Sequence, residues 1–410
     1  MYYLCDVTIL LSIILLLCML GVLHTYVLYP WWVVSGARTP VQRKDSEQAA
    51  KGPWPPVAVL MAAHNEESVL NEKLQSLAAQ DYPGQLNIYI GSDCSTDRTN
   101  DILTARAAED RRFHPTLYTT RQGKPGIINQ LVETATRHLP SASLHLIITD
   151  ASVILRPDTI TELIRPMRED ERIGVVDATM IQTGGTEDGI GQAEESYIDR
   201  EVTIKRAEGR RWGAMIGPFG GCWAIRAKAY TPVPDNFLVD DFFLCMAAYE
   251  QGYLGISSPK AVVEEAVGQS IKDEFRRKVR ISSGNWQNLV RFHKLWWPCW
   301  KNPLAFAFFS HKVLRWWTPF LLLIGGFAWA ALIVSSGYGG NYWFGVLFAT
   351  VVNVPILLLL LDIPLSILGV NFRLARYTHY FLAMNAALLV GFYRYLTGIK
   401  SNVWQPSQRH

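Results

Sequence analysis

A long apolar run near the N-terminus sets the first condition on how this chain can fold. Only Ser12 and His24 interrupt the segment from Thr8 to Tyr29. At about 1.5 Å per helical residue, it is long enough to cross a hydrocarbon core of about 30 Å. A cleaved signal peptide is the alternative, but no basic segment precedes the run and Pro30 follows it with two tryptophans rather than small residues. We therefore predict an uncleaved membrane anchor.

Three apolar segments near the C-terminus predict further membrane spans. They cover Thr318–Ser336, Trp343–Ile367 and Tyr380–Thr397. Basic residues lie on the sides of the four runs expected to face the cytosol, whereas residues 337–342, between the second and third runs, carry no charge. The basic residues are Arg38, Arg43 and Lys44 after the first run, Lys294, Lys301, Lys312 and Arg315 before the second, and Arg373 and Arg376 between the third and fourth. The chain is thus predicted to contain an anchor with its cytosolic flank (1–50), a cytosolic catalytic domain (51–290), interfacial aromatic and basic helices (291–317) and a transmembrane region of about three helices (318–410).

Composition excludes some partners and supports contact with a lipid bilayer. Hydrophobic residues make up 49% of the chain, which is high for a soluble protein. The net charge of +3 is accounted for by basic residues beside the apolar runs, so we expect no nucleic acid partner. The six cysteines have neither disulfide-framework nor zinc spacing, which indicates a reducing compartment.

The region between the membrane segments predicts an α/β fold. Short apolar runs at Val57–Ala62, Leu86–Ile90 and Leu144–Ile148 each end in polar residues, and helical patterns follow the first two. This order is typical of a mainly parallel sheet covered by helices. Since ligands bind beyond the carboxyl ends of such strands, the acidic residues there should meet at one edge of the sheet.

One of these acidic residues is a candidate metal ligand. Transfer of a sugar from a nucleotide diphosphate requires that the charged leaving group be held and stabilised. Mg²⁺ or Mn²⁺ does both when one or two carboxylates and the phosphate oxygens bind it. Asp150, at the end of the third apolar run, is the natural carboxylate.

Four motifs together resemble the family 2 glycosyltransferases of the GT-A fold. They are Ala62-Ala63-His64-Asn65-Glu66-Glu67, Ser92-Asp93-Cys94-Ser95-Thr96-Asp97, Asp150-Ala151-Ser152 and Asp240-Asp241-Phe242-Phe243-Leu244, in the family's order and spacing over about residues 57 to 290. The resemblance is closest to bacterial polysaccharide synthases of the hyaluronan and cellulose type. It implies a GT-A α/β domain with a mainly parallel sheet and helices on both faces. It also implies inverting transfer from a UDP-sugar at the cytosolic face of a bacterial inner membrane.

The resemblance also implies donor and metal contacts. Ala63, Glu66 and Asp93 would contact the nucleotide, Lys124 would meet a phosphate or the base, and Asp150 would bind the metal. Where many relatives have Asp-x-Asp, Ser152 offers only a neutral hydroxyl as a second metal ligand. The alternatives are an ordinary surface lysine at position 124, a strand-end role for Asp150, and turn or helix-cap carboxylates at Asp93 and Asp97; we assign Asp97 mainly to capping.

Two further segments carry the predicted acceptor site and base. Around Gly220 and Gly221, Phe219 and Trp223 offer faces on which a sugar could lie, in a segment that resembles the family's acceptor loop. Two adjacent aspartates in an apolar segment are costly to bury without a function. By the family's acidic pair, Asp241 is the base that takes the acceptor proton, and Asp240 is its neighbour.

A basic segment follows where processive relatives have Gln-x-x-Arg-Trp. Arg277 replaces the glutamine, Arg280 keeps the arginine and Ile281 replaces the tryptophan, although Trp286 could supply a ring from another turn. We expect Arg280 to stabilise the departing diphosphate and Arg277 to lie near the donor. Contact of these cations with lipid headgroups is the alternative.

The predicted function is inverting, metal-dependent transfer to a growing polysaccharide, with coupling to export left open. Loss of the glutamine and tryptophan favours a non-processive enzyme that acts on a lipid or lipid-linked acceptor. The third alternative is an inactive partner subunit or transport component, for which Asp-Ala-Ser is the one supporting feature. The sugar, the linkage and the formation of a homo-oligomer are left open.

Overall fold

A computed structural model describes most of the chain. It covers residues 2–36, 52–140, 142–183, 189–266, 271–335 and 372–399, with scattered positions between 350 and 365. Eight strands in these ranges form one sheet in the order β3-β2-β1-β4-β7-β6-β8-β5. The strands are β1 (Val57–Ala63), β2 (Leu86–Asp93), β3 (Phe113–Tyr118), β4 (His145–Thr149), β5 (Val153–Leu155), β6 (Ile173–Thr183), β7 (Cys222–Arg226) and β8 (Leu254–Ala266).

The sheet is mixed, with a parallel half that carries the predicted motifs. β1, β2, β3 and β4 are parallel, as are β6 and β8. β7 lies between β4 and β6 and is antiparallel to both, and β5 is antiparallel to β8. The three apolar runs predicted as buried strands are β1, β2 and β4, so their carboxyl ends lie at one edge of the sheet.

Helices cover both faces of the sheet because alternate strand residues point to opposite sides. In β1, Ala58, Leu60 and Ala62 belong to one hydrophobic core, while the intervening apolar residues belong to the other. The helices are α3 (Glu67–Ala78), α4 (Thr99–Glu109), α5 (Gly123–His138), α6 (Thr159–Glu169), α7 (Gly189–Trp212), α8 (Asp240–Glu250) and α9 (Ile271–Arg291), with a short η3 (Ala227–Ala229). The predicted α/β fold with helices on both faces is confirmed.

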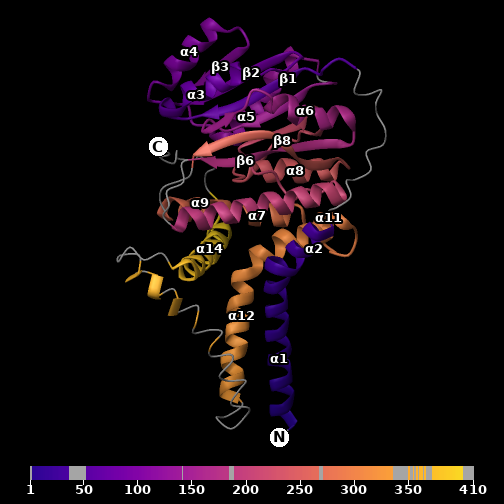
Figure 1. Cartoon of the computed structure of the whole chain (residues 1–410), viewed down its shortest axis with the longest axis vertical. Coiled ribbons are helices and arrows are strands. Elements are labelled where there is room, and N and C mark those ends of the chain that lie inside the picture. The colour runs from indigo at the N-terminus through magenta and orange to yellow at the C-terminus, as the bar shows by residue number, and fades with distance from the viewer. Residues whose placement is uncertain are drawn as a thin grey trace.

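Two long helical rods project from the underside of this domain (Figure 1). One is built from α1 (Tyr2–Leu23), η1 (His24–Leu28) and α2 (Tyr29–Gly36), and the other from α11 (Pro303–Phe308), η4 (Phe309–Val313) and α12 (Leu314–Ser335). The stretches Asp6–Gly36 and Pro303–Val334 are long and apolar enough to cross a membrane. They pack through small residues: a Cβ on Gly21 would lie 3.0 Å from Leu321. These rods contain the first and second predicted spans.

The remaining predicted spans have different outcomes. Most of Trp343–Ile367 lies outside the described residues. The run Tyr380–Thr397 lies almost wholly in α14 (Arg373–Leu396), which is not among the described helices long and apolar enough to cross a membrane. Instead, α14 packs along α9, where Ser283 Oγ donates a 3.0 Å hydrogen bond to the Gly391 carbonyl. The span at 380–397 therefore stays a prediction, and contact with α9 covers part of this helix.

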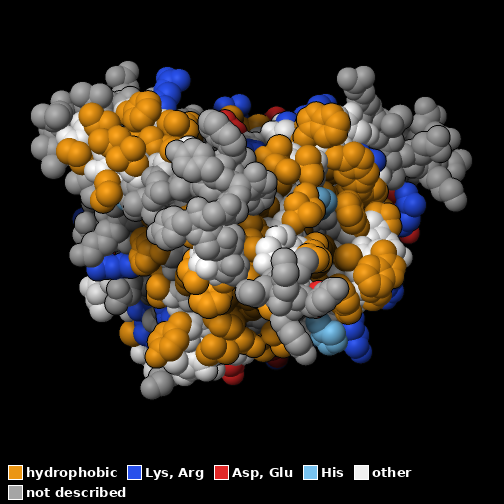
Figure 2. All heavy atoms as spheres, turned by 90° about the horizontal axis from the view of Figure 1, so that it is seen from below, with side chains coloured by type: hydrophobic (Ala, Val, Ile, Leu, Met, Phe, Trp, Pro, Cys, Tyr) orange, Lys and Arg blue, Asp and Glu red, His pale blue; other side chains and the backbone are white. Residues whose placement is uncertain are grey.

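Aromatic residues gather where the rods meet the domain. Seen from below, hydrophobic side chains spread over the underside and Lys and Arg side chains lie mainly toward its rim (Figure 2). Trp31, Trp297 and Trp300 are 71%, 52% and 75% exposed there, whereas Phe308 in α11 is fully buried. The segment after α9, including α10 (His293–Trp296), thus contributes both to the core and to an aromatic surface, and its interfacial role stays a prediction.

Candidate active site

The loops after β1 and β2 are tied to each other by reciprocal hydrogen bonds. The Asp97 carboxylate accepts from the backbone N–H of Glu67 and of Thr99, at 3.1 and 3.0 Å. The Glu67 carboxylate accepts from the N–H of Arg98 in return, at 2.9 Å. Asp97 therefore caps the start of α4, as predicted. Glu66 lies in this linked pair of loops, half-buried, with its N–H bonded to the Thr99 hydroxyl.

Asp93, at the end of β2, fixes the N-terminus of α5. Its buried carboxylate accepts from the backbone N–H of Gln122 at 2.6 Å and of Gly123 at 3.1 Å, and from the Arg121 guanidinium at 3.1 Å. Gly123 has a φ of 75°, which a residue with a Cβ rarely adopts. Asp93 therefore has the structural role that the sequence left open for it, since it holds a turn and the start of a helix. Its contact with a nucleotide stays a prediction.

Lys124, one residue into α5, forms an ion pair with Asp150. The ammonium Nζ lies 2.6 Å from Asp150 Oδ1, and the Asp150 side chain remains 41% exposed. Desolvation lowers the pKa of Lys124, but the charges of Asp150, Asp240 and Asp241 outweigh it and the net shift is upward. These interactions place one cation among the three predicted acidic site residues. Lys124 thus pairs with the candidate metal ligand, and its contact with a phosphate or the base stays a prediction.

The metal motif supplies a single carboxylate. The Ser152 hydroxyl donates to Glu265 on β8 at 3.2 Å. Among the residues that the structure describes, no group of three or more His, Cys, Asp or Glu side chains could hold a metal ion by itself. Asp150 is nonetheless exposed and lies at a strand end, which fits a divalent cation completed by diphosphate oxygens and water. Metal binding by Ser152 stays a prediction.

The paired aspartates begin α8 and lie against the glycine-rich loop before β7. Gly220 has a φ of 96°, and a Cβ there would come 2.3 Å from Asp241 Oδ2. The base candidate and the predicted acceptor loop are thus in direct contact, which a larger residue at Gly220 would prevent. Desolvation and the neighbouring charge of Asp240 raise the pKa of Asp241 to about 6. Asp240 is 7% exposed.

The two predicted arginines of α9 are close to one another and to this acidic group. Desolvation lowers the pKa of Arg280, while the charges of Asp240, Asp150 and Asp241 raise it and that of Arg277 lowers it. Arg280 is half-buried. Arg280 is therefore within electrostatic reach of all three carboxylates. Its role at the leaving diphosphate stays a prediction, as does the alternative contact with lipid headgroups.

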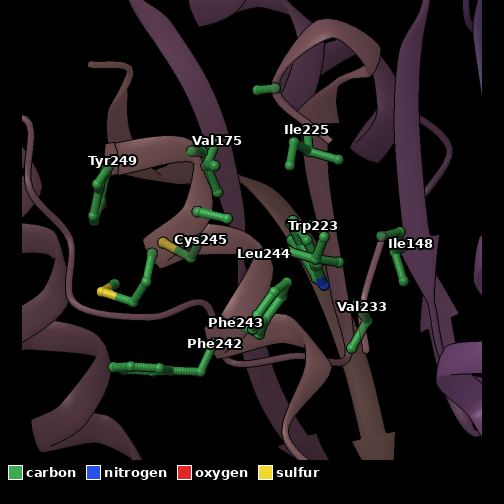
Figure 3. Packing of buried hydrophobic residues seen from close by; sticks show 14 of the residues in the cluster. Ile148, Val175, Trp223, Ile225, Val233, Phe242, Phe243, Leu244, Cys245 and Tyr249 are labelled. Carbon is green, nitrogen blue, oxygen red and sulfur yellow. The ribbon is translucent and has the colours of Figure 1, made fainter. Parts of the chain in front are cut away.

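Three predicted contact residues are buried: the roles of the Trp223 and Trp286 rings need correction, whereas the donor contact of Ala63 stays a prediction. Trp223 in β7 is 0% exposed and packs in the core beside Phe243 and Leu244 of α8 (Figure 3). Its ring cannot carry a sugar because strand alternation turns it away from the solvent. Trp286 is 5% exposed, with its ring 4.7 Å from that of Phe392 in α14. The Ala63 side chain is also fully buried, so only its backbone could meet a donor.

Sequence reasoning missed two buried charged residues beside the acceptor loop. Asp177 on β6 is 3% exposed and accepts from the Phe219 N–H at 2.9 Å. Lys205 on α7 is 5% exposed, and its Nζ lies 5.1 Å from the centre of the Phe219 ring. Desolvation raises the pKa of Asp177 to about 7, against the opposing charge of Lys205. The sequence feature that could have identified Asp177 is its position as an aspartate within the apolar run Ile173–Ala178.

A mixed sheet with acidic residues at its carboxyl edge and an aspartate pair behind a glycine loop is the arrangement that the sequence motifs predict for a glycosyltransferase. The sequence patterns agree: glycosyl transferase family 2 matches residues 58–231, and glycosyl transferase family group 2 matches residues 145–392, more than half of the chain. The chain belongs to the family 2 glycosyltransferases and is an enzyme of that class.

Curated relatives share part of the chain. It is 26% identical to an N-acetylglucosaminyltransferase of Rhizobium leguminosarum bv. viciae over 60% of each protein. A segment covering 27% of this chain and 26% of the other is 32% identical to a beta-monoglucosyldiacylglycerol synthase of Synechocystis sp.. The matched part therefore covers less than two thirds of either relative.

A solved structure has the same fold over nearly the whole chain. It is a mannosyltransferase from Pyrobaculum calidifontis in complex with GDP-mannose and Mn²⁺, with a TM-score of 0.67 and 20% identity. The match covers 94% of this chain and 99% of the other. At this identity the match establishes a shared fold.

Proposed function

We propose that this protein is an inverting, metal-dependent glycosyltransferase that uses a UDP-sugar donor at the membrane surface and extends a polysaccharide. The observation that carries the proposal is the contact of Asp241 with Gly220, beside the Lys124–Asp150 ion pair and Arg280. That arrangement combines a carboxylate of raised pKa with cations around a second, exposed carboxylate.

In the proposed reaction, Asp241 removes the proton from the acceptor hydroxyl as its oxygen attacks the anomeric carbon of the donor. The bond from that carbon to the diphosphate oxygen breaks, and its electron pair stays on the leaving UDP. Lys124 and Arg280 would stabilise this developing negative charge. A divalent cation held by Asp150 would neutralise the diphosphate when bound. Attack opposite the leaving group inverts the anomeric centre.

The polysaccharide acceptor is supported by likeness to the N-acetylglucosaminyltransferases over 60% of the chain. A lipid or lipid-linked acceptor is the second candidate. It is favoured by the segment similar to the diacylglycerol-modifying synthase and by the burial of Trp286, which leaves that ring unable to stack on a sugar chain. The inactive-subunit alternative is weakened because Asp150, Asp241 and Arg280 remain together.

We also propose that the two apolar rods anchor the enzyme in the bacterial inner membrane with the catalytic domain in the cytosol. The apolar lengths of Asp6–Gly36 and Pro303–Val334 support this placement. The exposed tryptophans between the rods and the domain fit the aromatic residues that gather at membrane surfaces.

The test is UDP release by the full chain in nanodiscs, with Mn²⁺ or Mg²⁺, across a panel of UDP-sugars and with GDP-mannose as a further donor. We expect release with one UDP-sugar, loss on chelation with EDTA, and a fall of about 100-fold or more in Asp241→Asn. Product size then separates a polymer from a single transferred sugar. Release only from GDP-mannose would refute the UDP assignment. Absence of release from every donor, with folded protein and added lipid acceptors, would refute the enzyme proposal.

A further inference from the structure

A row of buried charges runs along one face of α7, the helix that lies beneath the sheet (Figure 1). Glu201, Lys205 and Glu208 are 5%, 5% and 0% exposed. Residues four and three positions apart in a helix project from the same face, so the three side chains form one line. Burying three ionisable groups in so short a segment is costly unless each has a partner.

The two glutamates join α7 to the two apolar rods. Glu208 accepts from the Tyr29 hydroxyl of α2 at 2.7 Å and lies 2.8 Å from His311 of η4. Glu201 pairs with Lys312 at 2.7 Å and also with Arg315. These contacts fix the position of α7 relative to both rods.

Lys205, between the two glutamates, acts on the acceptor loop instead. Its Nζ lies over the Phe219 ring at 5.1 Å, within the range of a cation–π contact. Its positive charge favours the ionised forms of both Asp177 and Asp241, as the direction of its effect on the pKa of each shows. Lys205 therefore lies near the loop and near both carboxylates.

Asp177 connects this charge to the backbone of the loop. Its Oδ2 accepts from the Phe219 N–H at 2.9 Å, while its buried Oδ1 has no hydrogen-bond partner among the described residues. A carboxylate this deeply buried stays ionised only where a cation compensates it. The next residue of the loop, Gly220, lies against Asp241 so closely that a Cβ would be 2.3 Å from Oδ2. A shift of the loop would therefore displace the base.

We propose that Lys205 and Asp177 are positioning residues that hold the Phe219–Gly221 loop against Asp241, with α7 fixed in place by the apolar rods. The proposal rests on the proposed function for the role of Asp241. Neither residue needs to touch the donor, because the predicted donor contacts lie with Asp150 at the end of β4 and Lys124 at the start of α5. Displacement of a catalytic group by about 1 Å costs on the order of 100-fold in rate.

The test compares Lys205→Met, Asp177→Asn and the double variant in the full chain in nanodiscs. We expect each single variant to lose about 10- to 100-fold in kcat while the KM for the donor changes by less than about threefold. The double variant removes both charges together, so its loss should be smaller than the product of the two single losses. Arg206→Met is the matched control: it removes the neighbouring charge of α7, whose partner is Thr179, and should stay within about twofold of wild type.

A second measurement reads the loop without turnover. Hydrogen–deuterium exchange of a peptide spanning 217–223 should be at least about tenfold faster in Lys205→Met than in wild type, with exchange in β4 unchanged. If Lys205 had a merely structural role, Lys205→Met would lower the melting temperature but leave kcat per folded molecule and the exchange of this peptide unaltered. That result would overturn the proposal. An inactive wild type would refute the proposed function alone, and the exchange result would still decide whether Lys205 positions the loop.

Discussion

The titration of Asp241 links a single side chain to the pH dependence of the enzyme. A general base must be ionised to accept a proton, and desolvation together with Asp240 raises the pKa of Asp241 to about 6. Because the shift is upward, the base is lost as pH falls through about 6 rather than through the ordinary range near 4. We expect kcat/KM to rise with pH through about 6 and to level off above pH 7.

Asp240→Asn tests the cause of that shift. It removes the adjacent negative charge, so the pKa of Asp241 should fall and the acidic limb of the kcat/KM profile should move to lower pH, whatever the change in the plateau. Asp97→Asn, at the start of α4, is the control and should leave the limb in place. An unchanged limb in Asp240→Asn would mean that another group sets the profile.

The metal motif gives a second prediction for single residues. Asp150 has an exposed carboxylate, whereas the Ser152 hydroxyl donates to Glu265. We expect Asp150→Asn to raise the Mn²⁺ concentration for half-maximal activity by at least about tenfold, because Asp150 is the one carboxylate of the motif proposed to bind the metal. Ser152→Ala should change it by less than about threefold. Equal effects of the two substitutions, measured by metal titration of UDP release, would assign Ser152 as a ligand.

At the scale of elements, the N-terminus of α5 depends on a residue from another strand. Asp93 of β2 binds two backbone N–H groups and one guanidinium at that helix start. Asp93→Ala removes the acceptor of the buried Gly123 N–H and of two partly buried donors, so we expect the free energy of unfolding to fall by about 3 kcal/mol. Asp97→Ala, which removes a more exposed cap of α4, should cost about 1 kcal/mol. Denaturant unfolding of both variants measures the difference.

The same helix start bears on the donor site. Since Lys124 follows Gly123 directly, loss of the Asp93 contacts should also disturb the Lys124–Asp150 pair. The KM for the donor is therefore expected to rise in Asp93→Ala and to stay near the wild-type value in Asp97→Ala. Equal donor KM values in the two variants would show that the cap stabilises α5 without shaping the site.

At the scale of the whole molecule, the proposed orientation predicts which side of the membrane holds Cys94. This thiol is partly exposed in the loop after β2, whereas Cys222 and Cys245 are buried. In a variant that keeps Cys94 as its only cysteine, a membrane-impermeant maleimide should label inverted vesicles and spare intact cells. Labelling in intact cells would place the catalytic domain outside. In a separate test of the membrane anchor, full extraction of the protein from membranes by alkaline carbonate would contradict it.

The sequence determined the fold class and most of the candidate site because both follow from local patterns. Apolar runs that end in acidic residues identified β1, β2 and β4, and the order of the motifs identified the family. Asp240 and Asp241 were predicted as site residues because paired carboxylates in an apolar segment are recognisable without a structure. Asp150 and Arg280 were predicted because they match the family's motifs. The first apolar rod was equally clear, since its uninterrupted apolar composition predicts one long helix.

Tertiary structure decided which side chains are available to a ligand. The rings of Trp223 and Trp286 have the chemistry to stack on a sugar, but strand alternation and packing against α14 place both inside the core. The antiparallel insertion of β7, the packing of α14 along α9 and the approach of Lys205 and Asp177 to the Phe219–Gly221 loop depend on contacts between segments distant in sequence. The local sequence pattern indicates the chemistry that a side chain can carry out, whereas the packing of elements distant in sequence determines which groups it contacts.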